Sequence, residues 1–353
     1  MWQVVGQNRV VSLLQRSLEK ESLAHAYLLI GPPHVGKMTL ALNLAQALNC
    51  QATERPCGEC GSCQKIASAN HPDVQIIGLN QNGNSAEARS RTEISIDQIR
   101  QMQHSASLPP FEGKYKIFII EGAEFLSTEA ANCLLKTLEE PAGNIVFILL
   151  TVNDALLLET VISRCQRLEL APLPPAEVEV ALHQRWGIEP QRAKLLARLS
   201  RGCLGWALSA ASDDSLLGQR TEKLERLLAI IDSDGEERFA CATELAAQFS
   251  RNRDLVQETL DLWLGWWRDL LLVKAGCSDI ITNVDRLAAL TEMSAGYSLA
   301  QIKDFIKSIQ EAKEQLRQNA NPRLVLEVLM LDMPGKEGRR KENLTARLSL
   351  KNG

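Results

Sequence analysis

Short apolar runs alternate with amphipathic segments through the first part of the chain. Runs such as 117–120 and 145–150 have the length and content of buried strands, and the segments between them repeat apolar residues at helical spacing. Strands are expected at 25–30, 117–120, 145–150 and 166–170, and helices at 1–20, 37–47, 96–104, 128–139 (capped by Ser127 and ended by Pro141) and 154–162. This alternation predicts an α/β fold with a doubly wound parallel sheet.

The pattern of the chain after about residue 172 predicts helices. Pro172, Pro174 and Pro175 indicate a linker, and 176–212 has the pattern of short helices. From 215 to 333 no strand-like alternation interrupts the helical spacing, which predicts a helical bundle. The expected parts are an α/β domain at 1–172, a small helical domain at 173–214, a helical domain at 215–334 and a disordered tail at 335–353. A flexible insertion is expected at 78–93.

Composition supports a folded protein and excludes some classes. The 353 residues are 45% hydrophobic and 23% charged, which suffices for sizeable cores. A net charge of −4 argues neither for nor against nucleic acid. No apolar run approaches the roughly 20 residues of a membrane span. The start of the chain lacks the pattern of a signal peptide, so a cytoplasmic protein with reduced thiols is expected.

A glycine-rich loop at 31–37 follows the first predicted strand. In phosphate loops the backbone N–H groups cradle phosphates and the lysine reaches the β and γ oxygens, roles that fit Gly31, Gly36 and Lys37. The next position normally supplies a hydroxyl for Mg²⁺, but Met38 has a soft thioether. Thr39 has a hydroxyl about 100° further around the helix. Two alternatives stay open: weak nucleotide binding without hydrolysis, or a turn that only packs the sheet.

The strand at 117–120 ends in Glu121-Gly122, where an ATPase of this architecture carries Asp-Glu. The aspartate supports Mg²⁺ and the glutamate orients the attacking water. Glu121 is one methylene longer than aspartate, and it is either near a metal or a solvated strand end. Gly122 has no side chain to polarise water. The chain is therefore expected not to hydrolyse ATP on its own.

Four cysteines, Cys50, Cys57, Cys60 and Cys63, lie within 14 residues. Four thiolates at this density predict a closed, structural zinc site. Cys-x2-Cys-x2-Cys also occurs in iron–sulfur proteins, so the spacing leaves the metal open. The other five cysteines are scattered and expected to be small core residues: Cys133, Cys165, Cys203, Cys241 and Cys277.

Arg164, in Ser163-Arg164-Cys165, lies between the last predicted helix and strand of the α/β domain. An arginine at the edge of such a domain could reach the γ-phosphate of a neighbouring subunit's nucleotide, or it could form a surface salt bridge. Thr151, at the end of the strand 145–150, is either a phosphate-sensing residue or a cap.

Together these features resemble the clamp-loader subunits of bacterial DNA polymerase III in the AAA+ superfamily, and among them the delta-prime family. Besides the loop, the cysteines and residues 163–165, the matching stretches are 4–7, 25–28, 96–100, 134–141 and 319–324. The resemblance implies an AAA+ domain with a zinc module, a helical lid, and a collar domain that joins a hetero-pentameric ring. It also implies gamma/tau and delta subunits, a sliding clamp and primed DNA as partners, and Arg164 as an arginine finger in trans.

Two other functions, an active ATPase and a DNA-binding module, fit the sequence less well. An active gamma/tau-type ATPase would need the hydroxyl, the Asp-Glu pair and a lid arginine, where the chain has Met38, Glu121-Gly122 and Gly205. Glu124 would then have to orient the water. A zinc-dependent DNA-binding module would need more cations near the cysteines than Arg55 and Lys65.

Overall fold

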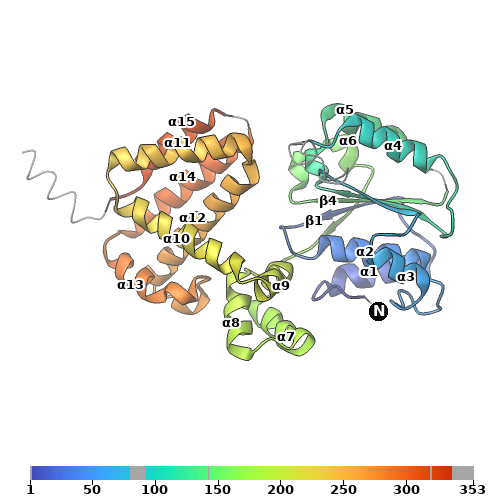
Figure 1. The fold of residues 1–353 in the computed structure, drawn as a ribbon, viewed down its shortest axis with the longest axis horizontal. Coiled ribbons are helices and arrows are strands. Elements are labelled where there is room, and N and C mark those ends of the chain that lie inside the picture. The colour runs from blue at the N-terminus through green and yellow to red at the C-terminus, as the bar shows by residue number, and fades with distance from the viewer. Residues whose placement is uncertain (1, 80–92, 142, 319, 336–353) are drawn as a thin grey trace, which may run out of the picture. The chain divides into compact units, whose positions relative to one another are not determined.

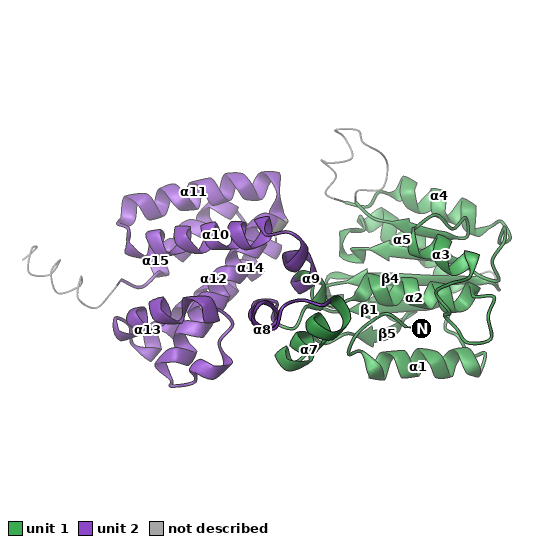
Figure 2. Ribbon diagram, turned by 60° about the horizontal axis from the view of Figure 1, so that its bottom comes forward, with its two compact units in different colours: residues 1–186, 202–206 green, residues 187–201, 207–353 purple. Residues whose placement is uncertain are grey.

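The structure, a computed structural model, describes residues 2–79, 93–141, 143–318 and 320–335. Most of the predicted insertion at 78–93 and of the predicted tail at 335–353 lies outside these ranges. The chain divides into two compact units, one of residues 1–186 and 202–206 and the other of residues 187–201 and 207–353 (Figure 2). Each unit has its own core, so each is described by itself.

The first unit is built on a five-stranded parallel sheet with the order β2-β3-β4-β1-β5. The strands are β1 Ala26–Ile30, β2 Val74–Ile77, β3 Lys116–Glu121, β4 Ile145–Thr151 and β5 Gln166–Glu169. The central strands read as continuous apolar runs because both faces of the sheet are covered. Phe118 and Phe147, opposite each other on β3 and β4, stack with ring centroids 5.5 Å apart. The predicted doubly wound parallel sheet is confirmed.

Helices cover both faces of this sheet (Figure 1). One face packs against α1 Asn8–Glu19, α2 Lys37–Asn49 and α3 Gly61–Ala67. The other face packs against α4 Ile96–Ala106, α5 Thr128–Glu139 and α6 Glu159–Ile162. Ser127 caps α5 as predicted, its Oγ accepting from the Ala130 N–H. A further helix, α7, spans Pro175–Trp186.

Two local predictions differ from the structure. The edge strand β2 was not predicted, because its four residues are too few for a clear period and include the polar Gln75. The expected helix at 154–162 is instead a 3-10 turn, Asp154–Leu156, followed by the single-turn α6. Leu157 and Leu158 adopt extended dihedrals between them, which breaks the helical hydrogen bonding.

The second unit is helical, and its long helices form the predicted bundle. Its helices are α8 Pro190–Leu199, most of α9 Leu204–Ser212, α10 Ser215–Asp232, α11 Gly235–Arg251, α12 Arg253–Lys274, α13 Leu287–Ala295, α14 Leu299–Arg317 and α15 Pro322–Asp332. Short 3-10 turns occur at Ser278–Ile280 and Val284–Arg286. Trp263 and Trp267 of α12 are buried, and Trp267 makes edge contacts with Tyr297 and Phe305.

The last helix, α15, has large apolar side chains on two faces. Leu326 of α15 is buried, but Leu324, Val328 and Leu331 are 61%, 48% and 67% exposed. Their spacing of four and then three residues places them on one stripe of the helix. Helix α15 therefore has an apolar face toward the core and a second apolar stripe toward solvent.

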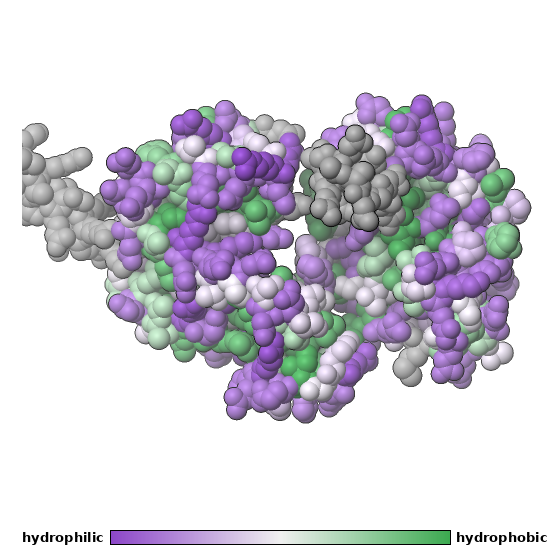
Figure 3. Space-filling model, viewed as in Figure 1, coloured by the Kyte–Doolittle hydropathy of each residue, from purple (hydrophilic) through white to green (hydrophobic). Residues whose placement is uncertain are grey.

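Cys241 is buried and Cys133, Cys165 and Cys203 are half-buried, but Cys277 is exposed, contrary to the prediction that it belongs to the core. Figure 3 shows hydrophilic residues spread over the visible surface between separate hydrophobic patches. Among the described residues, no helix combines the length and apolar character that crossing a membrane requires.

Candidate functional site

The phosphate-loop sequence lies between β1 and α2, at the carboxyl ends of the strands, where α/β sheets bind ligands. Gly36, with φ +106°, begins α2 in a conformation that suits glycine, and His34 is also left-handed at φ +61°. The Lys37 ammonium donates to the carbonyl oxygens of Gly31 and Pro32, at 2.5 and 2.9 Å. Burial lowers the pKa of Lys37, while nearby acidic groups oppose that shift. The strand–loop–helix arrangement of a phosphate loop is thus present.

The position after the lysine has become a packing position. Met38 is half-buried and packs against the hydrophobic core beneath α1 and α2. Thr39 is exposed. The one nearby hydroxyl is therefore displaced from the place where it would hold Mg²⁺, and nucleotide binding by Gly31, Gly36, Lys37 and Thr39 stays a prediction.

The backbone at the end of β3 is also changed. Gly122 has φ +70°, and a Cβ added there would lie 2.6 Å from the Phe125 ring. A glutamate at this position would be strained both by its φ and by that contact. Glu124 lies two residues on; its Oε1 accepts from the Val152 N–H at 3.2 Å, and its buried Oε2 has no hydrogen-bond partner among the described residues. The water-orienting glutamate is thus replaced by a turn.

Thr151 at the end of β4 is engaged in local structure. Its Oγ1 donates to the Asn153 carbonyl at 3.0 Å and accepts from the Asn153 N–H at 3.2 Å. Its own carbonyl accepts from the Gly31 N–H at 3.2 Å. Of the two roles open to Thr151, the geometry favours the capping role.

The segment 202–206 contacts the phosphate loop within the first unit. The Gly205 N–H donates to the His34 carbonyl at 2.9 Å, and a Cβ on Gly205 would lie 2.9 Å from that same oxygen. Gly202, with φ +83°, is hydrogen-bonded by its carbonyl to the Leu173 N–H at 2.9 Å. A sensor arginine at 205 would have no room while this contact holds.

Arg164 follows α6 and lies beside the end of α5. Its Nη2 donates to the Glu139 carboxylate at 2.6 Å, and its Nη1 donates to the Thr160 carbonyl at 2.9 Å. The Arg164 side chain is 33% exposed, so a second chain could still reach the guanidinium. Sequence reasoning identified Arg164 but missed Glu139, because nothing in a linear pattern pairs residues 25 positions apart.

The structure brings the four predicted metal ligands together. The sulfur atoms of Cys50, Cys57, Cys60 and Cys63 all lie within 4.8 Å of one another, and Cys57 and Cys63 are 3.9 Å apart. Four sulfurs arranged tetrahedrally at about 2.3 Å from Zn²⁺ would be about 3.8 Å apart. Backbone N–H groups of Cys57 and Cys60 point at the sulfurs of Cys50 and Cys57, at 3.4 and 3.3 Å. This donor set fits a structural metal ion.

The thiols of this cluster differ in acidity. N–H groups of Cys60 and Glu59 lower the pKa of Cys57 to about 6, whereas burial raises the pKa of Cys63 to about 12. A divalent cation would stabilise the thiolate forms of all four and offset the burial of Cys63. With all four sulfurs used, the site has no position for a substrate.

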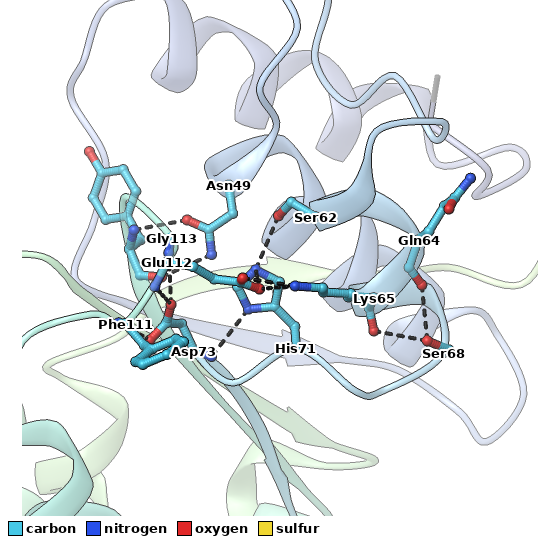
Figure 4. Close-up of polar contacts among 11 residues, drawn as sticks. Asn49, Ser62, Gln64, Lys65, Ser68, His71, Asp73, Phe111, Glu112 and Gly113 are labelled. Atoms are coloured by element: carbon cyan, nitrogen blue, oxygen red, sulfur yellow. Dashed lines mark hydrogen bonds and ion pairs between the residues drawn. The ribbon is translucent and has the colours of Figure 1, made fainter.

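Beside the cysteines, a polar network joins α3 to the loop before β3 (Figure 4). The buried His71 accepts from the Asp73 N–H at its Nδ1 (3.1 Å), and its Nε2 lies 3.1 Å from Ser62 Oγ. An accepting Nδ1 places the proton on Nε2, and burial lowers the pKa of His71, favouring this neutral form. His71 therefore donates toward Ser62 and cannot act as its general base, so the pair is structural.

Asp73 fastens the loop before β3. Its carboxylate accepts from the N–H groups of Phe111, Glu112 and Gly113 at 2.6, 2.8 and 2.7 Å. Burial alone would raise the pKa of Asp73, but these three donors outweigh it and hold that pKa below its ordinary value. Lys65 of α3 adds a bidentate ion pair with Glu112 at 2.8 Å. The network attaches the cysteine module to the sheet.

We expect Asp73→Asn to lower the free energy of unfolding by about 3 kcal/mol at pH 7, because charged hydrogen bonds are lost. A carboxylate with a depressed folded pKa stabilises the fold above its unfolded pKa of about 3.9, and this stabilisation disappears as pH falls through the folded pKa. The difference in unfolding free energy between the unaltered protein and Asp73→Asn should therefore shrink below about pH 4. Urea unfolding at pH 7 and pH 3 measures it. The exposed Asp97, paired with Arg100 at 3.6 Å, is the control, and equal effects of Asp97→Asn and Asp73→Asn would contradict the assignment.

The fold and these sites define a P-loop α/β domain with an attached four-cysteine module. Residues 6–174 match the family described as DNA polymerase III, delta subunit, and residues 218–334 match its C-terminal family. The chain belongs to the delta-prime family of DNA polymerase III clamp-loader subunits.

The similarity to individual relatives extends over most of the chain. The DNA polymerase III subunit delta' of Bacillus subtilis is 31% identical over 329 residues, covering 92% of this chain and 95% of the relative. The tau subunit of Escherichia coli is 32% identical over 285 residues, covering 73% of this chain and 42% of the relative. A solved gamma subunit-related protein of Thermotoga maritima is 20% identical, with coverage of 92% and 98% and a TM-score of 0.45.

Proposed function

We propose that this chain is a non-hydrolysing subunit of the clamp loader, which supplies Arg164 in trans to the ATP of a neighbouring gamma/tau subunit. The observation that carries the proposal is the contrast between two sites. The chain's own nucleotide site lacks three groups that an ATPase uses: the hydroxyl after the loop lysine, the water-orienting glutamate after β3 and the lid arginine. Arg164, in contrast, is accessible at the domain surface. In this role the chain is not an enzyme by itself.

Two glycines support this assignment over a damaged but recoverable ATPase. Gly122 is left-handed and packed against Phe125, and Gly205 touches the His34 carbonyl. Because both positions exclude the side chains that hydrolysis needs, the backbone itself is adapted to their absence. The hydrogen bond from the Gly205 N–H to the His34 carbonyl also joins 202–206 directly to the phosphate loop, which supports a rigid stator.

The proposed partners are gamma/tau and delta subunits in a hetero-pentameric cytoplasmic ring that loads a sliding clamp on primed DNA. We assign the lid to residues 173–214 and ring contacts to the collar at 215–334. The solvent-facing stripe of Leu324, Val328 and Leu331 supports such contacts, because large apolar side chains grouped on one helix face favour protein association. The cysteine module is proposed to hold zinc in a structural role.

An active gamma/tau-type ATPase is the second candidate. The 32% identity to the tau subunit favours it, as does Glu124, which raises the pKa of Lys37 against the effect of burial. In that case Glu121 would hold the metal and Glu124 would orient the water. The exposure of Thr39 and the packing of Met38 leave that metal without its hydroxyl ligand.

Purified chain alone should hydrolyse no ATP above background, because the groups that orient water are missing. Mixed with gamma/tau and delta subunits, it should elute with them in size-exclusion chromatography. DNA-stimulated turnover of that mixture should exceed that of the same mixture without the chain. Hydrolysis by the chain alone at about 1 s⁻¹, in the ordinary enzyme range, would instead favour the ATPase. Failure to co-elute would contradict the subunit assignment.

A further inference from the structure

The guanidinium of Arg164 has a defined orientation before any partner binds. Nη2 donates to Glu139 Oε1 at 2.6 Å, and Nη1 donates to the Thr160 carbonyl at 2.9 Å and lies 3.5 Å from Ser163 Oγ. A guanidinium has five N–H donors in one plane. Among the described residues none accepts a hydrogen bond from Nε. The plane is therefore fixed by contacts to Nη1 and Nη2 while donor capacity remains for an anion from another chain.

Glu139 is the last residue of α5, and Arg164 lies two residues beyond the end of α6, which packs on the same face of the sheet as α5 (Figure 1). A helix C-terminus has partial negative charge, so a carboxylate there is unfavourable for the helix that carries it. The pair is exposed, at 33% for Arg164 and 51% for Glu139, and exposed ion pairs contribute little to stability. Glu139 is thus unfavourable for α5, and its ion pair with Arg164 contributes little to the free energy of unfolding of the domain.

We propose that Glu139 is a positioning residue that holds the Arg164 guanidinium in the orientation in which it meets the γ-phosphate of a neighbouring subunit's ATP. The inference rests on the proposed in-trans role of Arg164. A free arginine side chain must lose its rotamer freedom as the transition state forms. With Glu139 and the Thr160 carbonyl already engaged, that ordering precedes the reaction, as catalysis by preorganised groups requires.

The test is steady-state ATP hydrolysis by the reconstituted complex with primed DNA and clamp. At the active site that this chain completes, Glu139→Ala should lower kcat about tenfold, equivalent to about 1.4 kcal/mol, with KM for ATP unchanged, because orientation matters in the transition state. Glu139→Gln keeps an acceptor oxygen at the same reach and should stay within about threefold of the unaltered complex. Glu140→Ala is the matched control, since Glu140 is the adjacent glutamate and is also exposed, and it should have no effect.

A double substitution separates positioning from an independent effect. In complexes that already carry Arg164→Ala, adding Glu139→Ala should change kcat no further, because Glu139 acts only through that arginine. Unchanged kcat in Glu139→Ala alone, an equal loss in Glu140→Ala, or a further loss in the double variant would each overturn the inference. If Arg164→Ala alone leaves kcat unchanged, the proposed function itself fails. A loss in Arg164→Ala without one in Glu139→Ala removes only the positioning role.

Discussion

Arg164→Ala should lower ATP hydrolysis at the active site that this chain completes in the assembled clamp loader by about a thousandfold, while subunit assembly stays intact. Arginine fingers supplied in trans to a nucleotide are worth about 10³ to 10⁵ in kcat because they neutralise charge that develops on the transferred phosphoryl group. The loss concerns the active site that this chain completes. In a ring with further sites, single-turnover measurement of that site should show the full effect.

The expected loss depends on the fork geometry of the guanidinium as well as on its charge. Arg164→Lys keeps a cation but loses the planar donors, so it should recover only part of the activity. Arg167 is the control: it lies three residues further along, is 49% exposed and pairs with Asp154 and Glu169. If Arg167→Ala lowered turnover as much as Arg164→Ala, the effect would reflect general surface charge and the finger assignment would be wrong.

Loss of one cysteine ligand should have the largest effect on stability. We expect the purified chain to contain about one zinc ion, and Cys63→Ser to contain at least about tenfold less. Since metal binding and folding of such modules are coupled, the variant should lose about 4 kcal/mol or more of unfolding free energy. Cys63 of α3 is fully buried, and its carbonyl accepts from Gln46 of α2 at 2.9 Å, so the loss should reach the core.

Metal analysis by mass spectrometry and thermal unfolding measure these two effects. Cys277→Ser is the matched control, because Cys277 is exposed and outside the cluster, and it should keep both metal and stability. A brown protein that contains iron and sulfide would identify the other metal centre that the spacing allows. Full zinc content in Cys63→Ser would contradict the four-sulfur site.

The elements that sequence predicted well are those with strong local signals. The apolar runs of β3 and β4 are buried on both faces, so their composition alone indicates strands in a parallel sheet. Ser127 and Pro141 mark the ends of α5 by local hydrogen bonding and backbone restriction. Strand β2 gave no such signal, because its pairing with β3 is decided by neighbours 43 residues away in sequence.

The sequence by itself determined the parallel sheet, the phosphate loop without its hydroxyl, the four cysteines and the presence of Arg164, because each depends on residue types at short spacing. Only the tertiary structure decided what surrounds them. The left-handed Gly122 against Phe125, the contact of Gly205 with His34, and the ion pair of Glu139 with Arg164 are set by backbone geometry and chain crossings. Such contacts join segments that are distant in sequence, so the spacing of residue types along the chain does not reveal them.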